Sequence, residues 1–309
     1  MKADEIFSFF YSKHKNSKLA VATHENADVD ALASAYVLRK YFPNSTVAVP
    51  KRIAYDGENF IKKFNVRFEW FESLDPKNFD GLIAVDTSSK SLLPAEKWKV
   101  LLIIDHHRGE PDLDAEYKII DENAGATSQV VAEILPNIDE EDAFVLAAGI
   151  LSDTARFKRG SLEIFETFTK LLRQSGKTYD EVYDLGEPEK PNEAKKAVLT
   201  ALQRVEFLEL GGYVVAFSHV GTKESIASAL LSEIADIAFV ASYKENEKIV
   251  RISARARKNA DIKLNEVMKE VGISLGGDGG GHEKAAGAQG RASEKEALEK
   301  CTEVLKKYI

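Results

Sequence analysis

Hydrophobic residues in the first half of the chain form short continuous runs that alternate with helical patterns. Three runs predict buried β-strands, at residues 18–24 (KLAVATH), 81–86 (GLIAVD) and 100–105 (VLLIID). Apolar runs without polar alternation are typical of a parallel sheet that is covered on both faces. Helical spacing appears in four segments, at residues 29–42, 127–135, 141–151 and 162–174. The pattern predicts an α/β domain with a parallel sheet and helices on both faces.

The pattern changes after residue 175, where glycine and proline interrupt the apolar periodicity. Residues 192–209 predict one long helix that would connect two domains. Further strands are expected at residues 212–218, 237–243 and 248–254, and further helices at 222–233, 261–270 and 293–307. A glycine-rich stretch at residues 276–290 precedes the last helix. We therefore expect a larger domain, a linker helix and a smaller α/β domain, at residues 1–185, 186–207 and 208–309.

The composition is that of a folded globular protein. Of 309 residues, 44% are hydrophobic, and no apolar run approaches the ~18 residues that a membrane span needs. The first residues lack the apolar segment of a secretory signal, so we expect no membrane association and a cytoplasmic location. The single cysteine, Cys301, excludes an internal disulfide framework and a thiolate metal cluster. A net charge of -8 argues against a globally basic nucleic-acid surface, but not against a locally basic one.

Acidic and histidine side chains gather where the predicted strands end. His24, Asp28 and Asp30 follow the first strand, Asp86 ends the second, Asp105, His106 and His107 end the third, and Asp153 follows a predicted helix. In an open parallel sheet, the carboxyl ends of the strands line the ligand crevice. We therefore expect these side chains to meet at one edge of the sheet.

Each of these residues also has an ordinary structural interpretation. An aspartate after a strand often caps the next helix, which would suit Asp28 or Asp86 alone. Several carboxylates at one edge would repel one another, however, and a cation would remove that repulsion. Carboxylate and imidazole ligands favour Mn²⁺ or Mg²⁺, and they also admit Co²⁺ or Zn²⁺. Two ions that share an aspartate would suit hydrolysis of a phosphoester or a phosphoanhydride.

Four motifs in this region resemble those of the DHH phosphoesterase superfamily. They are HENADVDALAS, VDTSS, IDHHRG and GILSDTARF, and they stand in the family's order. In addition, GGDGGGHEKAAGA at residues 276–288, preceded by RISARAR at residues 251–257, resembles the C-terminal DHHA1 domain. The resemblance covers nearly the whole chain and implies a catalytic DHH domain followed by a substrate-binding DHHA1 domain.

The resemblance also implies a centre for two divalent cations, with Mn²⁺ expected and Mg²⁺ or Co²⁺ as alternatives. One cation would be held by His24, Asp28 and Asp86, and the other by Asp30, Asp86, His106 and Asp153. His107 would contact the scissile phosphate and help the leaving group depart. Asp105 would orient the adjacent histidines.

In the second domain, the resemblance implies that substrate is bound by Arg255, Gly279, Gly280, Gly281 and His282. Glycines allow the backbone to approach a phosphate or a sugar closely. Two neighbouring arginines, Arg251 and Arg257, would extend a basic surface, or they would simply face water.

Among members of the superfamily, the chain is similar to nanoRNases, RecJ-like enzymes and small archaeal-type DHH exonucleases. The GGGH signature argues against an inorganic pyrophosphatase, whose C-terminal domain differs. We expect a Mn²⁺-dependent 3′→5′ exonuclease that releases nucleoside monophosphates from short or single-stranded RNA or DNA. One alternative is a small-nucleotide phosphatase or phosphodiesterase that acts on 3′-phosphoadenosine 5′-phosphate or on dinucleotides. Another is a replication or repair subunit that binds a helicase or replisome partner, and self-association into a homo-oligomer is also open.

Overall fold

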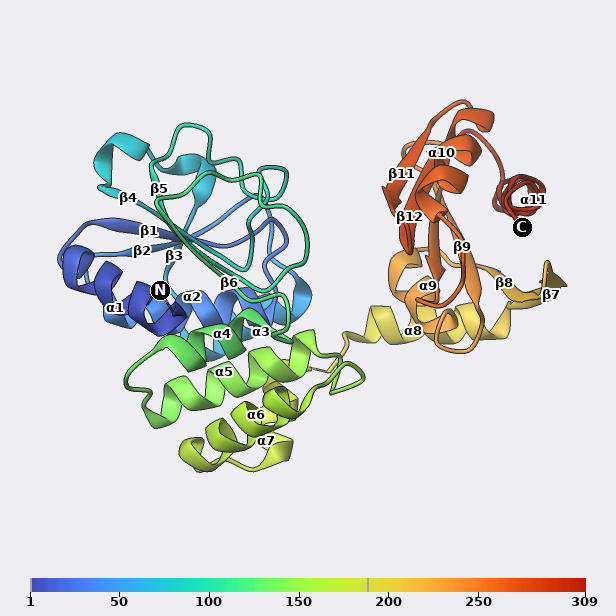
Figure 1. Ribbon diagram of the computed structural model, residues 1–309. Coiled ribbons are helices and arrows are strands. Elements are labelled where there is room, and N and C mark those ends of the chain that lie inside the picture. Colours follow the sequence, from blue (N-terminus) through green and yellow to red (C-terminus); the bar gives the residue numbers. More distant parts are fainter. Residues whose placement is uncertain (1, 188) are drawn as a thin grey trace. The chain divides into compact units, whose positions relative to one another are not determined.

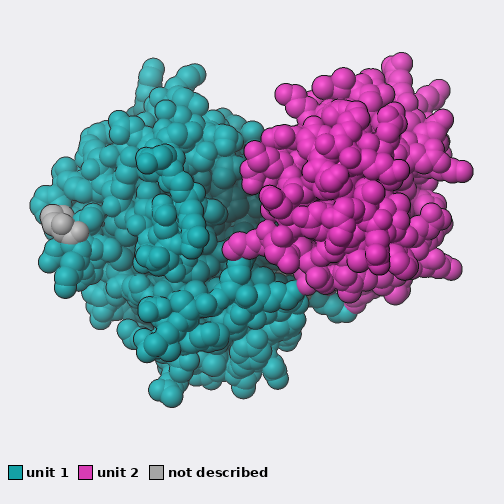
Figure 2. All heavy atoms as spheres, turned by 45° about the vertical axis from the view of Figure 1, so that its right-hand side comes forward, with its two compact units in different colours: residues 1–189 teal, residues 190–309 magenta. Residues whose placement is uncertain are grey.

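The computed structural model describes residues 2–187 and 189–309. The chain divides into two compact units, residues 1–189 and 190–309, which Figure 1 shows as ribbons and Figure 2 as two colours. Across the described residues, each unit contains one six-stranded sheet covered by helices. The mixed α/β fold class expected from the sequence is confirmed.

The sheet of the first unit is parallel throughout, with strand order β3-β2-β1-β4-β5-β6. Its strands are β1 (Leu19–Ala22), β2 (Thr46–Val49), β3 (Phe68–Trp70), β4 (Gly81–Val85), β5 (Val100–Asp105) and β6 (Tyr117–Ile120). The strands β1, β4 and β5 are fully buried, and they are the three that the apolar runs predict. The other three were not predicted, because they have only three or four residues each and lie toward the edges of the sheet.

The two faces of this sheet are covered differently (Figure 1). One face packs against the α-helices: α1 (Ala3–His14), α2 (Val29–Tyr41), α3 (Tyr55–Phe64), α4 (Thr127–Ile134), α5 (Glu140–Asp153), α6 (Leu162–Ser175) and α7 (Tyr179–Gly186). The other face packs against two short 3₁₀ helices (Phe71–Ser73 and Pro76–Asn78) and loops that contribute Leu93 and Leu113. Apolar cover on both sides explains why the central strands carry no polar alternation.

The second unit has strand order β11-β12-β10-β9-β8-β7, in which only β8 and β9 pair in parallel. Its strands are β7 (Glu206–Leu210), β8 (Tyr213–His219), β9 (Ile237–Lys244), β10 (Ile249–Ala256), β11 (Asp278–His282) and β12 (Ala285–Gly290). Its helices are α8 (Asn192–Gln203), α9 (Glu224–Leu231), α10 (Leu264–Ser274) and α11 (Glu294–Leu305). Among the described helices, none is both long enough and apolar enough to cross a membrane.

Two local predictions in this unit were wrong or incomplete. The helix expected over residues 192–209 ends at Gln203, because residues 206–210 pair with β8 as the edge strand β7. The glycine-rich stretch, for which no strand was expected, contains the hairpin of β11 and β12. In both places, hairpin pairing with the neighbouring strand overrides the local sequence pattern.

The three glycines in β11 differ in what a side chain would meet there. A Cβ on Gly279 would lie 2.0 Å from the Met268 carbonyl oxygen of α10, whereas a Cβ on Gly280 would meet nothing within 4 Å. Gly281 has a φ of 136°, a conformation that favours glycine. The packing of α10 against the hairpin therefore requires Gly279 but not Gly280.

This difference predicts that two alanine substitutions lower the free energy of unfolding by unequal amounts. Gly279→Ala should lower the free energy of unfolding by about 1–3 kcal/mol, because the methyl group overlaps main-chain atoms. Gly280→Ala should change it by less than about 0.5 kcal/mol. Urea unfolding of both variants measures this, and equal losses of stability would contradict the packing described.

Candidate metal centre

The acidic and histidine side chains predicted from the sequence meet at the carboxyl edge of the first sheet. His24 follows β1, Asp86 follows β4, and Asp105 ends β5 immediately before His106 and His107. Asp28 and Asp30 come from the start of α2, and Asp153 is the last residue of α5. Within the described residues, their ligand atoms lie within 4.8 Å of one another in three groups: His24–Asp28–Asp86, Asp30–His106–Asp153 and Asp86–His106–His107. The structure therefore brings together the side chains that sequence reasoning assigned to two cations.

The first group is organised around the Nε2 atom of His24. This atom lies 3.2 Å from Asp86 Oδ2 and 4.0 Å from Asp28 Oδ1. The other ring nitrogen, Nδ1, donates to the carbonyl oxygen of Glu25 at 2.8 Å, which leaves Nε2 directed at the carboxylates. Asp28 also caps α2, since its Oδ1 accepts from the Ala31 N–H at 3.1 Å. Asp28 thus has the ordinary capping role in addition to its place in this group.

The second group contains a buried atom whose surroundings require a cation or a proton. His106 Nε2 lies 3.4 Å from Asp153 Oδ2 and 3.7 Å from Asp86 Oδ1, and it has no hydrogen-bond partner among the described residues. Its ring donates through Nδ1 to the Ala124 carbonyl at 3.3 Å, so a neutral ring presents the Nε2 lone pair to two carboxylates. A divalent cation would bind the imidazole nitrogen of His106 and the carboxylates of Asp86 and Asp153 at once. The residues present therefore fit a metal centre.

Asp86 belongs to the group of His24 and also faces His106 of the second group. Its Oδ2 faces His24, and its Oδ1 faces His106 and also accepts from Thr127 Oγ1 at 2.7 Å. Its φ of 61° is left-handed, a conformation that aspartate tolerates better than most residues. One carboxylate that divides its two oxygens between two ligand groups is the arrangement that a bridging ligand needs.

Asp105 holds the two histidines that follow it. Its Oδ1 accepts from the His106 N–H at 2.8 Å, the His107 N–H at 3.2 Å and His107 Nδ1 at 2.8 Å. Burial opposes ionisation of this carboxyl, but the bonds from His107 outweigh it and lower its pKa. The same bond is the main cause that raises the pKa of His107 to about 9, so His107 carries a proton at neutral pH. His107 is 53% exposed, and its outward nitrogen is therefore accessible to a substrate.

Crowding and burial raise the pKa of Asp28 and Asp30. Burial and the charge of Asp86 raise the pKa of Asp28 to about 7, and they raise the pKa of Asp30 well above its usual value. For His24, burial opposes the charged form, but Asp86 and Asp28 outweigh it and raise the pKa to about 10. The cluster thus retains protons wherever no cation neutralises it.

Of the residues expected to bind substrate, Arg255, Gly280 and His282 lie on one face of the second sheet, whereas Gly279 and Gly281 alternate to the opposite face. Arg255 of β10 pairs with Ala285, which pairs in turn with His282 of β11, and side chains in such register point to the same face. One step along, Ser253, Gly287 and Gly280 are aligned in the same way. Arg255 is half-buried, burial lowers its pKa, and its guanidinium makes no hydrogen bond or ion pair with the described residues. This face therefore offers an unpaired positive charge beside an exposed glycine backbone.

A cavity of about 430 Å³ lies over this face. Its lining residues include Glu224, Arg251, Ser253, Asp278, Gly279 and Gly280, but neither Arg255 nor His282 lines it. A Cβ on Gly280 would meet nothing within 4 Å, so packing does not require glycine there, and the missing side chain leaves the floor of the cavity open.

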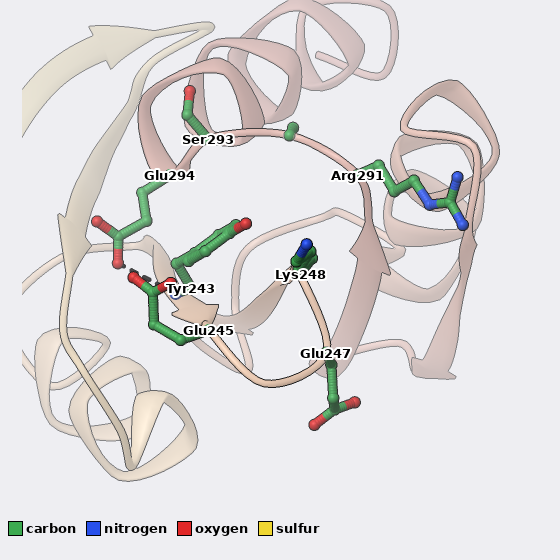
Figure 3. Close-up of a pocket in the computed structure, with 8 residues that line it drawn as sticks. Tyr243, Glu245, Glu247, Lys248, Arg291, Ser293 and Glu294 are labelled. Carbon is green, nitrogen blue, oxygen red and sulfur yellow. Dashed lines mark hydrogen bonds between the residues drawn. The ribbon is translucent and has the colours of Figure 1, made fainter.

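A larger cavity, of about 880 Å³, lies at the turn between β9 and β10, at the other end of β10 from Arg255 (Figure 3). None of the residues predicted to bind substrate lines that larger cavity, and its lining mixes Glu245, Glu247 and Glu294 with Lys248 and Arg291.

Two neighbouring arginines have structural roles instead of extending a basic surface. Arg251 pairs with Glu247, with nitrogen–oxygen distances of 2.8 and 2.9 Å. Arg257 donates to the carbonyl oxygens of Ser232 and Glu233, just after the end of α9. The positive charge offered by this face therefore comes chiefly from Arg255.

Sequence reasoning missed the contribution of α4. The main-chain N–H groups of Thr127 and Ser128 hold Asp30, and the Thr127 hydroxyl holds Asp86. The signal in the sequence is weak: a threonine and a serine precede an apolar helix, which indicates a helix start and no chemistry.

The raised pKa values predict how metal-induced stabilisation depends on pH. His24 titrates near 6.5 when unfolded and at about 10 when folded, so its stabilising contribution is complete below pH 6.5 and falls as pH rises toward 10. Asp28 acts in the same direction between its unfolded pKa and about 7. Because a cation replaces these protons, the rise in melting temperature on adding Mn²⁺ should grow from pH 6.5 to pH 8.5. Thermal unfolding in EDTA and in Mn²⁺ measures this, and a rise that is constant or shrinks with pH would contradict it.

Comparison with known proteins agrees with the site. Residues 18–151 match the model of the DHH family, N-terminal domain, and residues 211–309 match that of the DHHA1 domain. An uncharacterized protein of Methanocaldococcus jannaschii, MJ0988, is 31% identical over 303 residues, which cover 93% of this chain and 91% of that protein. A crystal structure of an exopolyphosphatase-related protein from Bacteroides fragilis has the same fold, with a TM-score of 0.79 at 17% identity over 99% of this chain and 96% of that one.

A manganese-dependent inorganic pyrophosphatase of Methanocaldococcus jannaschii is also similar, with 28% identity over 278 residues, 82% of this chain and 85% of that protein. Because 82% of this chain exceeds the first unit, the similarity reaches into the second unit. The second unit therefore resembles the corresponding part of this pyrophosphatase more than the GGGH signature suggests. The matched family models, the extended similarity to MJ0988 and the acid–histidine edge together show that this chain belongs to the DHH phosphoesterase family and carries a C-terminal DHHA1 domain.

Proposed function

We propose that this protein is a two-metal-ion phosphodiesterase, acting as a Mn²⁺-dependent 3′→5′ exonuclease on short or single-stranded RNA or DNA. The observation that carries the proposal is the division of the Asp86 carboxylate between two groups of ligands, one at His24 and one at His106. The 3′→5′ direction and the oligonucleotide substrate rest on the resemblance to small DHH exonucleases.

The two ligand groups would each hold one divalent cation. His24 and Asp28 would complete the first group, and the second would be completed by Asp30, His106 and Asp153. Bound divalent cations would activate water and neutralise the charge of the scissile phosphate. Burial excludes bulk water from Asp30 and Asp86, so their charges act in a medium that screens them weakly.

His107 is placed to serve the leaving group. Its Nδ1 is fixed by Asp105, and it lies 3.8 Å from Asp86 Oδ1, next to the proposed cations. Its hydrogen bond to the Asp105 carboxylate favours the protonated ring, whose free nitrogen could donate to a phosphate oxygen or to the departing oxygen.

The second unit supports a diester substrate rather than a small inorganic one. The unpaired guanidinium of Arg255, in register with His282, would be satisfied by a phosphate group, since Arg and phosphate form strong charge-assisted bonds. The exposed backbone at Gly280 would admit a sugar or a phosphate at close range. Pyrophosphate is the second candidate substrate, favoured by the similarity to the manganese-dependent pyrophosphatase.

The direct test is cleavage of 5′-labelled oligonucleotides of 2 to 20 nucleotides, as RNA and as DNA, in the presence of Mn²⁺. The proposal predicts a descending ladder of products, lost in Asp86→Ala because both ligand groups lose their shared residue. Release of labelled mononucleotide at once from every length would instead indicate 5′→3′ attack. If pyrophosphate is hydrolysed and the oligonucleotides survive intact, the exonuclease proposal is wrong.

Replacing Arg255 tests the role of the second unit. Arg255→Gln should raise the KM for an oligonucleotide roughly 10- to 100-fold, the loss expected for a charged hydrogen bond of about 1.5–3 kcal/mol. The kcat should change less than about threefold, because Arg255 belongs to the unit that does not carry the metal centre. Arg291→Gln is the matched control, since it removes the same charge from an exposed position of the same unit. Equal effects of the two variants would show that Arg255 contributes only general electrostatic attraction.

A further inference from the structure

The first turn of α4 holds two buried carboxylates of the centre, Asp30 and Asp86. Main-chain N–H groups of Thr127 and Ser128 donate to Asp30 Oδ2 and Oδ1, at 2.7 and 2.8 Å. The Thr127 hydroxyl donates to Asp86 Oδ1 at 2.7 Å. All four residues are buried, with exposed fractions of 3% or less. Thr127 therefore donates hydrogen bonds to two carboxylates from different elements: Asp30 at the start of α2 and Asp86 after β4.

Helix α5 packs against the contact between Ser128 and Asp30. A Cβ on Gly149 would lie 2.1 Å from Ser128 Oγ and 2.9 Å from Asp30 Oδ1, so only glycine leaves room there. The Ser128 hydroxyl in turn lies 3.2 Å from Ser34 Oγ of α2. This packing fixes the position of the first turn of α4 relative to α2 and α5.

The plane of the Asp86 carboxylate needs such a contact. The last torsion of an aspartate is soft, so no rotamer preference by itself fixes which way the two oxygens point. Each oxygen of Asp86 faces a different ligand group: Oδ2 faces His24 at 3.2 Å, and Oδ1 faces His106 at 3.7 Å. The Thr127 hydroxyl occupies one acceptor position of Oδ1 and leaves another for the group that contains His106.

We propose that Thr127 is a positioning residue, whose hydroxyl fixes the rotation of the Asp86 carboxylate and so sets cation affinity in the group that contains His106. The inference rests on the metal centre of the proposed function. The two groups respond unequally to loss of the hydroxyl. The bond that is lost is to Oδ1, whereas Oδ2 keeps its neighbour His24.

The test compares Thr127→Val, which keeps the shape of the side chain and removes the hydroxyl, with Thr127→Ser, which keeps the hydroxyl. Calorimetric titration of each purified full-length protein with Mn²⁺ alone measures binding without any substrate. Thr127→Val should weaken one of the two binding steps by about 10-fold or more, as loss of a hydrogen bond to a metal ligand typically does. Thr127→Ser should stay within about threefold of the unmodified protein. In activity assays, Thr127→Val should need more Mn²⁺ for half-maximal rate and recover most of its kcat at saturating Mn²⁺.

Ser34→Ala is the matched control, because it removes a buried hydroxyl from the same packing contact without touching a carboxylate. It should lower the melting temperature and leave Mn²⁺ affinity unchanged. If Thr127→Val does not fold, Thr127→Ala supplies a second variant without the hydroxyl. Unchanged Mn²⁺ binding in the hydroxyl-free variants, or equal weakening in Thr127→Ser, would overturn the role of Thr127. A protein that binds Mn²⁺ as expected but cleaves no oligonucleotide would overturn the proposed function and leave the role of Thr127 standing.

Discussion

Repulsion among buried carboxylates is the constraint on which the first unit depends. Asp28, Asp30, Asp86 and Asp153 meet at one edge of the sheet, and burial raises the pKa of three of them, Asp28, Asp30 and Asp153. Groups of this kind are stable only when protons or cations balance the charge. His106 Nε2, which has no hydrogen-bond partner among the described residues, indicates that the arrangement suits a cation rather than protons. A cation can bind the imidazole lone pair and the carboxylates together.

The fold produces this arrangement by placing the ends of several strands and helices at one edge of the sheet. Parallel strands deliver His24, Asp86 and Asp105 at their carboxyl ends, as parallel sheets do for ligand sites in general. The start of α4 then adds donors that hold Asp30 and Asp86, and the end of α5 adds Asp153. In the second unit, Gly280 and the positively charged Arg255 lie on one face of the sheet, which under the proposed function would bind an anionic group of the substrate.

The sequence was informative where chemistry and periodicity coincide. Strands β1, β4 and β5 and the side chains at their ends were predicted, because continuous apolar runs end directly in acids and histidines. The edge strand β7 was missed, since helical spacing conceals the hairpin that it forms with the neighbouring strand β8. Thr127 was missed for another reason: its hydroxyl meets Asp86, 41 residues away along the chain, only in the folded structure.

The most direct test of the central claim is the number of Mn²⁺ ions that each chain binds. Equilibrium dialysis followed by elemental analysis gives this number without any assumption about substrate. We expect two ions per chain, and fewer than one tightly bound ion in Asp86→Asn, because that variant weakens the ligand shared by both cations. A single ion in the unmodified protein, or two ions that persist in Asp86→Asn, would contradict the shared role of Asp86.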